Sequence, residues 1–439
     1  LMNRILFFLS NIFKSAVSSE FNRNIAKVFS GTLLAQVIAI GISPILTRIY
    51  TPEDFSNLAL YLSVVAILSV VATLKYDKAI ILPKDNKNAL SLVVLSTFFT
   101  LLSGVIFIII YFFGYEYIVR IFKIDGIKSW LVFVPITILA RALYTILNTW
   151  FNRKKKYAVL SKNRVFTSSF NGGLKIFFQV VAKLGAFGLV LSEAISQIVS
   201  LGLFGYRFFM ENLLSLKKLN KIDLIECAKT YKSFPIYSLP ADFLVIFSRE
   251  LPVLMFTGYF GAGVVGFYML TKRVLDVPFT LLSTSILEVF KQKANEDFHN
   301  LGNCKEIFIK TFKKLFFISI IPFSILFIIS PSVFSFVFGS EWRVAGEYAQ
   351  VLSIMYFFKF ISSPLSFVFF IFNKQHINLI LQIIAIFIVL LSFYFGTIYY
   401  KTAYNVLIIY SFSCSLVYIV YLIISYKISI NNEKIFTSK

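Results

Sequence analysis

The chain has 439 residues, of which 58% are hydrophobic and 15% are charged, and its formal net charge is +22. Soluble globular proteins have about 45–50% apolar and about 25% charged residues, so the composition excludes an ordinary soluble domain. Apolar runs of about 18–25 residues recur along the chain, and a helix of this length crosses the hydrocarbon core of a bilayer. A transmembrane β-barrel would instead show alternating segments of about 10 residues. We therefore predict an all-α polytopic membrane protein.

The segment 1–20, which reads LMNRILFFLSNIFKSAVSSE, is predicted to be an interfacial helix. It is similar to a signal peptide in outline. However, its apolar core is short and interrupted, and no clear small-x-small cleavage site follows. We expect this segment to lie on the cytoplasmic surface of the membrane.

Twelve transmembrane helices follow from the criterion of about twenty apolar residues per span. The longest exposed loop, 210–234, is basic, suits a short amphipathic helix and divides the spans into six and six. We expect an N-terminal lobe over 1–209, a basic cytoplasmic linker over 210–234 and a C-terminal lobe over 235–439. The predicted spans are 28–49, 56–74, 90–113, 129–151, 164–182, 186–206, 236–257, 264–288, 314–338, 345–371, 377–398 and 403–425.

The positive charges indicate topology rather than nucleic-acid binding. If the N-terminus is cytoplasmic and the spans alternate, the cytoplasmic segments hold most of the lysines and arginines, including RKKK at 153–156. The bias is roughly four to one, as the positive-inside rule requires. Both termini are therefore predicted to be cytoplasmic. The opposite side holds only Arg48, Arg120, Lys123, Lys128, Lys183, Arg343 and Lys401.

No resident cofactor is predicted. The three cysteines, Cys227, Cys304 and Cys414, are far apart and have no CxxC spacing, so we expect neither a disulfide framework nor a metal site. The two histidines, His299 and His376, lie in polar loops and are interpreted as solvated side chains.

Charged residues inside the predicted spans are the candidates for function. The stretch 239–255, LPADFLVIFSRELPVLM, holds three of them among apolar residues. A charge at mid-depth costs about 2.5–3.5 kcal/mol on insertion scales, so most of these side chains should face a protein interior or a wet passage. The cationic candidates for substrate binding are Arg48, Arg141, Lys175, Arg249, Lys272, Arg273 and Lys359, and the acidic candidates for ion coupling are Glu193, Asp242, Glu250 and Asp276.

The cations outnumber the acids, and a positive interior suits an anionic solute, since arginine makes bidentate contacts with phosphate and lysine acts as a point charge. Asp242 and Arg249 are seven residues apart and share a helix face, but about 10 Å of axial rise separates them. Lys272 and Asp276 are four apart and can pair, and Arg273 competes for the same carboxylate. The structural alternative, helix-to-helix ion pairs or snorkelling ends, stays open for each charge.

The sequence over 29–85 resembles the start of bacterial Wzx-type polysaccharide repeat-unit (O-antigen) flippases, which belong to the multidrug/oligosaccharidyl-lipid/polysaccharide exporter superfamily. The resemblance is carried by Arg48 with TPEDF at 51–55, by KYDKAI at 75–80 and by GYFGAGVVGFYMLTKRV at 258–274. Ser56 stands where the family often has glycine, so the turn there does not depend on glycine.

This resemblance implies two six-helix lobes around a central cationic cavity. It further implies alternating access that moves an undecaprenyl-diphosphate-linked oligosaccharide, of O-antigen or capsule type, to the periplasmic leaflet of the bacterial inner membrane. A coupling H⁺ or Na⁺ is expected. The expected partners are the lipid-linked substrate, membrane lipids, a polysaccharide polymerase and a chain-length regulator, with no nucleic acid and a functional monomer.

Three alternatives to this function differ in span count, charge or loop length. A lipid II flippase of the superfamily usually has fourteen spans, and a multidrug exporter would need an acidic interior for cationic drugs. A membrane polysaccharide polymerase, which is an enzyme, usually carries a large outer loop, whereas the longest outer segment here is 114–128. We therefore expect a transporter and not an enzyme.

Overall fold

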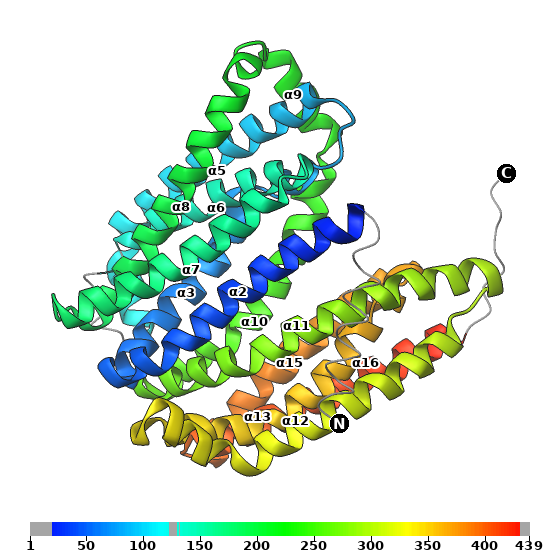
Figure 1. Ribbon diagram of the computed structural model, residues 1–439. Coiled ribbons are helices and arrows are strands. Elements are labelled where there is room, and N and C mark those ends of the chain that lie inside the picture. Colours follow the sequence, from blue (N-terminus) through cyan, green and yellow to red (C-terminus); the bar gives the residue numbers. More distant parts are fainter. Residues whose placement is uncertain (1–19, 123–129, 131, 431–439) are drawn as a thin grey trace. The chain divides into compact units, whose positions relative to one another are not determined.

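The computed structural model describes residues 20–122, 130 and 132–430 (Figure 1). The predicted interfacial segment at the N-terminus lies outside the described residues, apart from Glu20. Every regular element in the described part is helical, which confirms the predicted all-α fold.

Twelve long helices account for the twelve predicted spans, six before the short helix α9 and six after it, in the part of the chain that the structure describes. The turn Phe234–Ser238 is π-helical and Ser340–Trp342 is 3₁₀-helical. The helices are α2 (Glu20–Ile49), α3 (Pro52–Ala72), α4 (Tyr76–Ala79), α5 (Asn86–Phe122), α6 (Phe133–Arg153), α7 (Tyr157–Val180), α8 (Gly185–Leu216), α9 (Lys221–Thr230), α10 (Leu239–Phe260), α11 (Ala262–Leu301), α12 (Lys305–Phe338), α13 (Arg343–Leu365), α14 (Val368–Ile371), α15 (Gln375–Tyr399) and α16 (Ala403–Ser429).

Nine of the helical segments in the described residues are long and apolar enough to cross a membrane, so the chain is a multi-pass membrane protein. Helices α7, α10 and α11 are the long helices outside this set. Each of these three carries some of the candidate charges.

The chain forms two compact units. The first unit comprises Leu1–Ile49 and Tyr61–Phe243, and the second comprises Tyr50–Leu60 and Leu244–Lys439. Two helices are therefore divided: α3 gives its first turns to the second unit, and α10 gives its first turn to the first unit.

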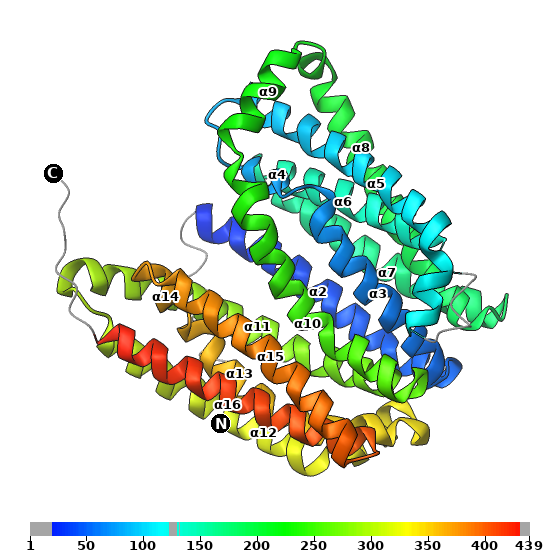
Figure 2. The ribbon, with the colours of Figure 1, turned by 180° about the vertical axis from the view of Figure 1, so that it is seen from behind.

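In the first unit, α7 packs on α2 and α8, and α6 packs on α5 and α8 (Figure 2). Aromatic side chains fill part of this core: the Trp150 ring meets Phe208 edge-on with centroids 5.7 Å apart, and Phe151 meets Phe204 at 5.1 Å. Full burial of side chains of this size stabilises the fold by about 1.5–3 kcal/mol each relative to exposure.

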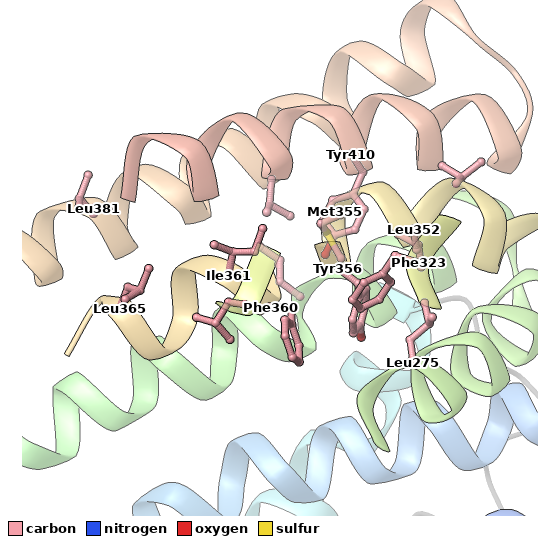
Figure 3. Close-up of a cluster of buried hydrophobic side chains, with 14 of the residues drawn as sticks. Leu275, Phe323, Leu352, Met355, Tyr356, Phe360, Ile361, Leu365, Leu381 and Tyr410 are labelled. Carbon is pink, nitrogen blue, oxygen red and sulfur yellow. The ribbon is translucent and has the colours of Figure 1, made fainter. Parts of the chain in front are cut away.

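In the second unit, α13 is the central helix and packs against α11, α12 and α16. Figure 3 shows Tyr356 and Phe360 of α13 close to Phe323 of α12, with Tyr410 of α16 above Met355. A helix that is apolar on most of its circumference is stable only inside a bundle or a membrane, so α13 takes the interior position.

Candidate functional site

The candidate charges fall into four local groups that are built from different helices. Lys175 of α7 and Glu193 of α8 form one group, and Asp242 at the start of α10 joins a second one. In the second unit, Glu250 of α10 and Asp276 of α11 each bind cations from neighbouring positions. Every acidic candidate therefore has a cationic partner.

In the first unit, the Glu193 carboxylate is held by an amide and an ammonium group. The Asn171 side-chain amide donates to Glu193 Oε2 at 2.6 Å, and Lys175 Nζ lies 3.2 Å from the same oxygen. The side chains of Lys175 and Glu193 are only 7% and 18% exposed. Arg141 of α6 is half-buried and adds a second positive charge that acts on Glu193. Two cations therefore face one carboxylate in this group.

This group is part of a polar stripe along α7. Its members recur every four residues, so successive members are neighbours on the helix surface. Each step turns by about 40°, so the stripe winds partly around α7 over about 24 Å. Hydrogen bonds join the stripe to Ser200 (2.7 Å from Asn163 Nδ2) and to Ser196 (2.8 Å from Asn171 Nδ2), and its last amide donates to the Ile49 carbonyl at 2.8 Å. The stripe consists of Asn163, Thr167, Asn171, Lys175 and Gln179.

Asp242 lies between two lysines of the KYDKAI motif. Its Oδ2 is 3.1 Å from Lys75 Nζ and 2.7 Å from Lys78 Nζ. Lys75 has a left-handed backbone conformation, with φ of 62°, which turns the chain between α3 and α4. The motif thus brings both ammonium groups to the first turn of α10, and Asp242 is neutralised twice.

In the second unit, Glu250 bridges two cations. Its Oε1 lies 3.0 Å from Arg249 Nε and its Oε2 lies 3.5 Å from Lys272 Nζ. The Glu250 side chain is only 11% exposed, whereas that of Arg249 is 54% exposed. More than half of the Arg249 side-chain surface is therefore exposed, although its Nε is paired with Glu250.

Lys359 of α13 lies in an aromatic setting. Its Nζ is 4.5 Å from the ring centroids of both Phe279 and Tyr356, and 3.6 Å from Asp276 Oδ1. The Tyr356 hydroxyl donates to the same carboxylate oxygen at 2.7 Å. Aromatic faces attract a cation, so the ring pair compensates in part for the removal of this ammonium group from water.

The remaining candidates have less defined surroundings. Arg48 is exposed in the last turn of α2, and Arg273 is half-buried on α11. Spacing along α11 suggested that Lys272 pairs with Asp276, but Lys272 pairs with Glu250 of the neighbouring helix α10. Asp276 binds Lys359 and Tyr356 instead. Contacts between helices thus replace the contact within α11.

Sequence reasoning missed several residues that complete these groups. Asn171 and Tyr356 are uncharged, so a search for intramembrane charges does not find them. Lys75 and Lys78 lie outside the predicted spans, where their charge indicates topology alone. The four-residue repeat of polar residues on α7 was the available signal for Asn171, since it places that amide on the face of Lys175.

The balance of charge in the second unit favours an anionic ligand. Of the candidate charges in this unit, two are carboxylates, Glu250 and Asp276, and four are basic side chains on α10, α11 and α13. No cluster of three or more histidine, cysteine, aspartate or glutamate side chains that could hold a metal ion occurs in the described residues. These cations are Arg249, Lys272, Arg273 and Lys359.

Comparison with known proteins gives a family and a fold. The family model described as "Polysaccharide biosynthesis protein" matches residues 45–347. No curated protein matches the chain.

The fold is that of the MATE and MOP transporters. An inward-facing multidrug resistance MATE family transporter of the MOP superfamily superposes with a TM-score of 0.70 at 15% identity, over 90% of this chain and 94% of that one. A MOP superfamily transporter from Pyrococcus furiosus, described by a binding pocket of reversed polarity, gives 0.58 at 14% identity over 94% and 96%. A MATE transporter from Vibrio cholerae gives 0.56 at 11% identity over 94% and 96%.

Proposed function

This chain belongs to the polysaccharide biosynthesis protein family, and we propose that it is a flippase for lipid-linked oligosaccharide. In this proposal it moves undecaprenyl-diphosphate-linked repeat units of O-antigen or capsule from the cytoplasmic to the periplasmic leaflet of the bacterial inner membrane, by alternating access. Its family and its transporter fold agree with an exporter and not with an enzyme.

The observation that carries the proposal is the excess of cations among the candidate charges of the second unit, where Arg249, Lys272, Arg273 and Lys359 outnumber the carboxylates Glu250 and Asp276. A diphosphate carries several negative charges and many acceptor oxygens. Arginine can bind such a group with two parallel hydrogen bonds, and lysine can bind it as a point charge. Of the basic side chains, Arg249 offers the most exposed guanidinium group.

The first unit would supply a second contact region. Arg141 and Lys175 together carry one positive charge more than Glu193 neutralises. Arg48, at the end of α2, is exposed and would meet the polar head group as it enters or leaves. The lipid tail would remain in the bilayer, where its burial needs no polar partner.

Coupling to a cation gradient is part of the proposal. Glu193, Asp242, Glu250 and Asp276 are the candidate carboxylates for this coupling, and each has a cationic partner within 3.6 Å. A carboxylate released from its partner by the substrate would be able to take up H⁺ or Na⁺. Proton uptake by the purified protein upon addition of a lipid diphosphate would support this coupling.

A multidrug exporter is the second candidate, because the solved structures with this fold include MATE transporters. Cationic drugs would need an acidic interior, and the described charges have the opposite balance. A membrane polysaccharide polymerase is the third, and a test must distinguish it from a flippase.

The deciding experiment locates the lipid-linked oligosaccharide after deletion of the gene. A membrane-impermeant periplasmic ligase would tag only repeat units that have reached the outer leaflet. The proposal expects untagged, intact repeat units on the cytoplasmic side. Normal periplasmic single units that fail to polymerise would overturn it and favour the polymerase.

A matched pair of variants then tests the site. Arg249→Ala should abolish surface polysaccharide while the protein level and membrane insertion stay normal. Arg343→Ala is the control, since Arg343 also pairs with a glutamate, Glu347 at 3.6 Å, but at the exposed start of α13. Full complementation by Arg249→Ala would remove this residue from the site.

A further inference from the structure

Helix α9 is fixed to the first unit by one face only. Asp223 Oδ1 lies 2.8 Å from Lys87 Nζ, the hydroxyl of Tyr76 donates to the Ala228 carbonyl at 3.2 Å, and Cys227 is buried. A capping box with Asn220 fixes the first turn of the helix. The orientation of α9 about its own axis is therefore determined.

The opposite face is apolar and exposed. Ile222 is 76% exposed and Ile225 is 55% exposed. These residues are three apart, so they are neighbours on the helix surface. Two such side chains on a helix of ten residues form a surface that water does not favour.

Lysines surround these two isoleucines. Lys221 and Lys229 lie on the exposed side of α9, and Lys217 and Lys218 follow the end of α8 directly before it. All four are exposed. On α9 itself, Glu226 is the exposed acid. The surface is thus positive around an apolar centre, as in helices that lie in the headgroup region of a membrane.

The position of α9 in the chain agrees with this interpretation. Helix α8 is one of the membrane-length helices, and it keeps exposed apolar side chains up to its last turns, with Met210 at 71% and Leu214 at 76%. Only four residues separate the end of α8 from the start of α9. The helix therefore starts where the apolar surface of α8 ends.

We propose that this α9 surface, made of Lys217, Lys218, Lys221, Ile222, Ile225 and Lys229, binds anionic phospholipid headgroups with its two isoleucines in the interfacial region. The phosphates of phosphatidylglycerol complement the lysines, and the acyl-chain boundary takes up the isoleucine side chains. Each lysine near an anionic bilayer strengthens attraction about fivefold. This inference does not rest on the transport proposal.

The test uses the full chain with its native cysteines replaced by serine and Glu226 replaced by cysteine, which leaves both isoleucines and all the lysines in place. An environment-sensitive dye is attached to that cysteine, and its fluorescence is measured in nanodiscs of phosphatidylcholine, with or without phosphatidylglycerol. The nanodiscs also carry a lipid with a spin label near the headgroup, which quenches the dye. We expect stronger quenching and a blue shift when phosphatidylglycerol is present, and a loss of this difference at high salt.

The triple variant K217Q/K218Q/K221Q should need at least about tenfold more phosphatidylglycerol for the same quenching. The control K305Q/K310Q/K313Q removes the same charge from exposed positions on α12 and should behave as the parent. Equal quenching in both lipids, or equal loss in both triple variants, would overturn the proposal. A dye that stays in water in both lipids would overturn it as well, and would show that the surface serves a protein partner instead.

Discussion

The backbone amide of Gly266 donates a hydrogen bond of 2.6 Å to the hydroxyl of Ser56, although 210 residues separate them in the chain. The TPEDF motif prepares this contact. Thr51 and Asp54 cap the start of α3 reciprocally. The Thr51 backbone amide donates to Asp54 Oδ2 at 3.0 Å, and the Asp54 backbone amide donates to the Thr51 hydroxyl at 3.2 Å. Phe55 then packs edge-on against Trp342 with centroids 5.0 Å apart. Two of the three motifs that carried the family resemblance, TPEDF with the Ser56 that follows it and the segment 258–274, thus meet within the second unit.

Gly266→Ala should destabilise the second unit. A β-carbon at this position would lie 1.9 Å from the carbonyl oxygen of Pro52, a backbone atom that cannot rotate away. We expect a loss of about 1–3 kcal/mol, the usual effect of overpacking. Thermal unfolding of the detergent-solubilised protein would measure it.

Gly263→Ala is the matched control in the same helix, because a β-carbon there would have no neighbouring atom within 4 Å. Alanine favours helix by up to about 1 kcal/mol over glycine, so this variant should be neutral or slightly stabilised. Equal destabilisation by both variants would show that close packing at Gly266 is not the cause.

Lys175 and Glu193 should depend on each other. Removal of one partner of a buried ion pair costs about 3–5 kcal/mol, because the other charge is left uncompensated. Lys175→Met and Glu193→Gln should each lower the unfolding temperature, and the double variant should recover much of the loss. Additive effects of the two substitutions in a double-mutant cycle would contradict the pairing.

Lys359 should tolerate arginine better than methionine. Arginine retains the charge and can also lie over the rings of Phe279 and Tyr356. Lys359→Met should therefore destabilise by about 1–2 kcal/mol, and Lys359→Arg by less. The same unfolding assay measures both. If methionine were the better tolerated residue, the cation would contribute nothing to the stability of the aromatic setting.

The anchor of α9 should hold throughout the neutral pH range. The hydrogen bond from Lys87 holds the pKa of Asp223 below its ordinary 3.8. A carboxylate with a lowered pKa stabilises the folded state when the pH is above its ordinary pKa. This stabilisation is lost as the pH falls through the pKa of the folded state.

Cys227 reports this anchor, because it is buried and burial raises the pKa of its thiol. The rate at which maleimide labels Cys227 is measured in a C304S/C414S variant and is divided by the rate for the exposed cysteine of an E226C variant. This ratio should not change between about pH 5 and 8. Asp223→Asn should accelerate labelling by about two- to fivefold, as expected for an exposed pair. Labelling that varies with pH across this range would contradict the assignment.

The sequence was sufficient to predict the number and order of the twelve long helices in the described residues. The apolar run 403–425, for example, lies in one long helix, Ala403–Ser429. The run 345–371, in contrast, is divided between α13 and the short helix α14. The ends were harder to predict, because hydropathy detects only the part of a helix that contacts lipid. Helix α12 begins at Lys305, nine residues before the predicted start at 314, since its first turns are polar.

The candidate charges could also be found, but their partners could not. Spacing along one helix suggested Lys272 with Asp276, whereas Lys272 pairs with Glu250 of α10. Such contacts depend on how neighbouring helices are rotated, which one sequence does not determine. The Ser56–Gly266 contact belongs to the same class, because neither residue is charged or apolar enough to signal it.

The division of α3 between the two units has a consequence for biosynthesis. Ser56 is made 210 residues before Gly266, its hydrogen-bond partner. At about 5–20 residues per second, a ribosome needs roughly 10–40 s to supply that partner. During this interval the segment Tyr50–Leu60 has been translated, whereas the helices of its own unit have not. The nascent chain therefore passes through a stage in which all residues of the first unit have been translated, while this segment still lacks the helices of its own unit to pack against.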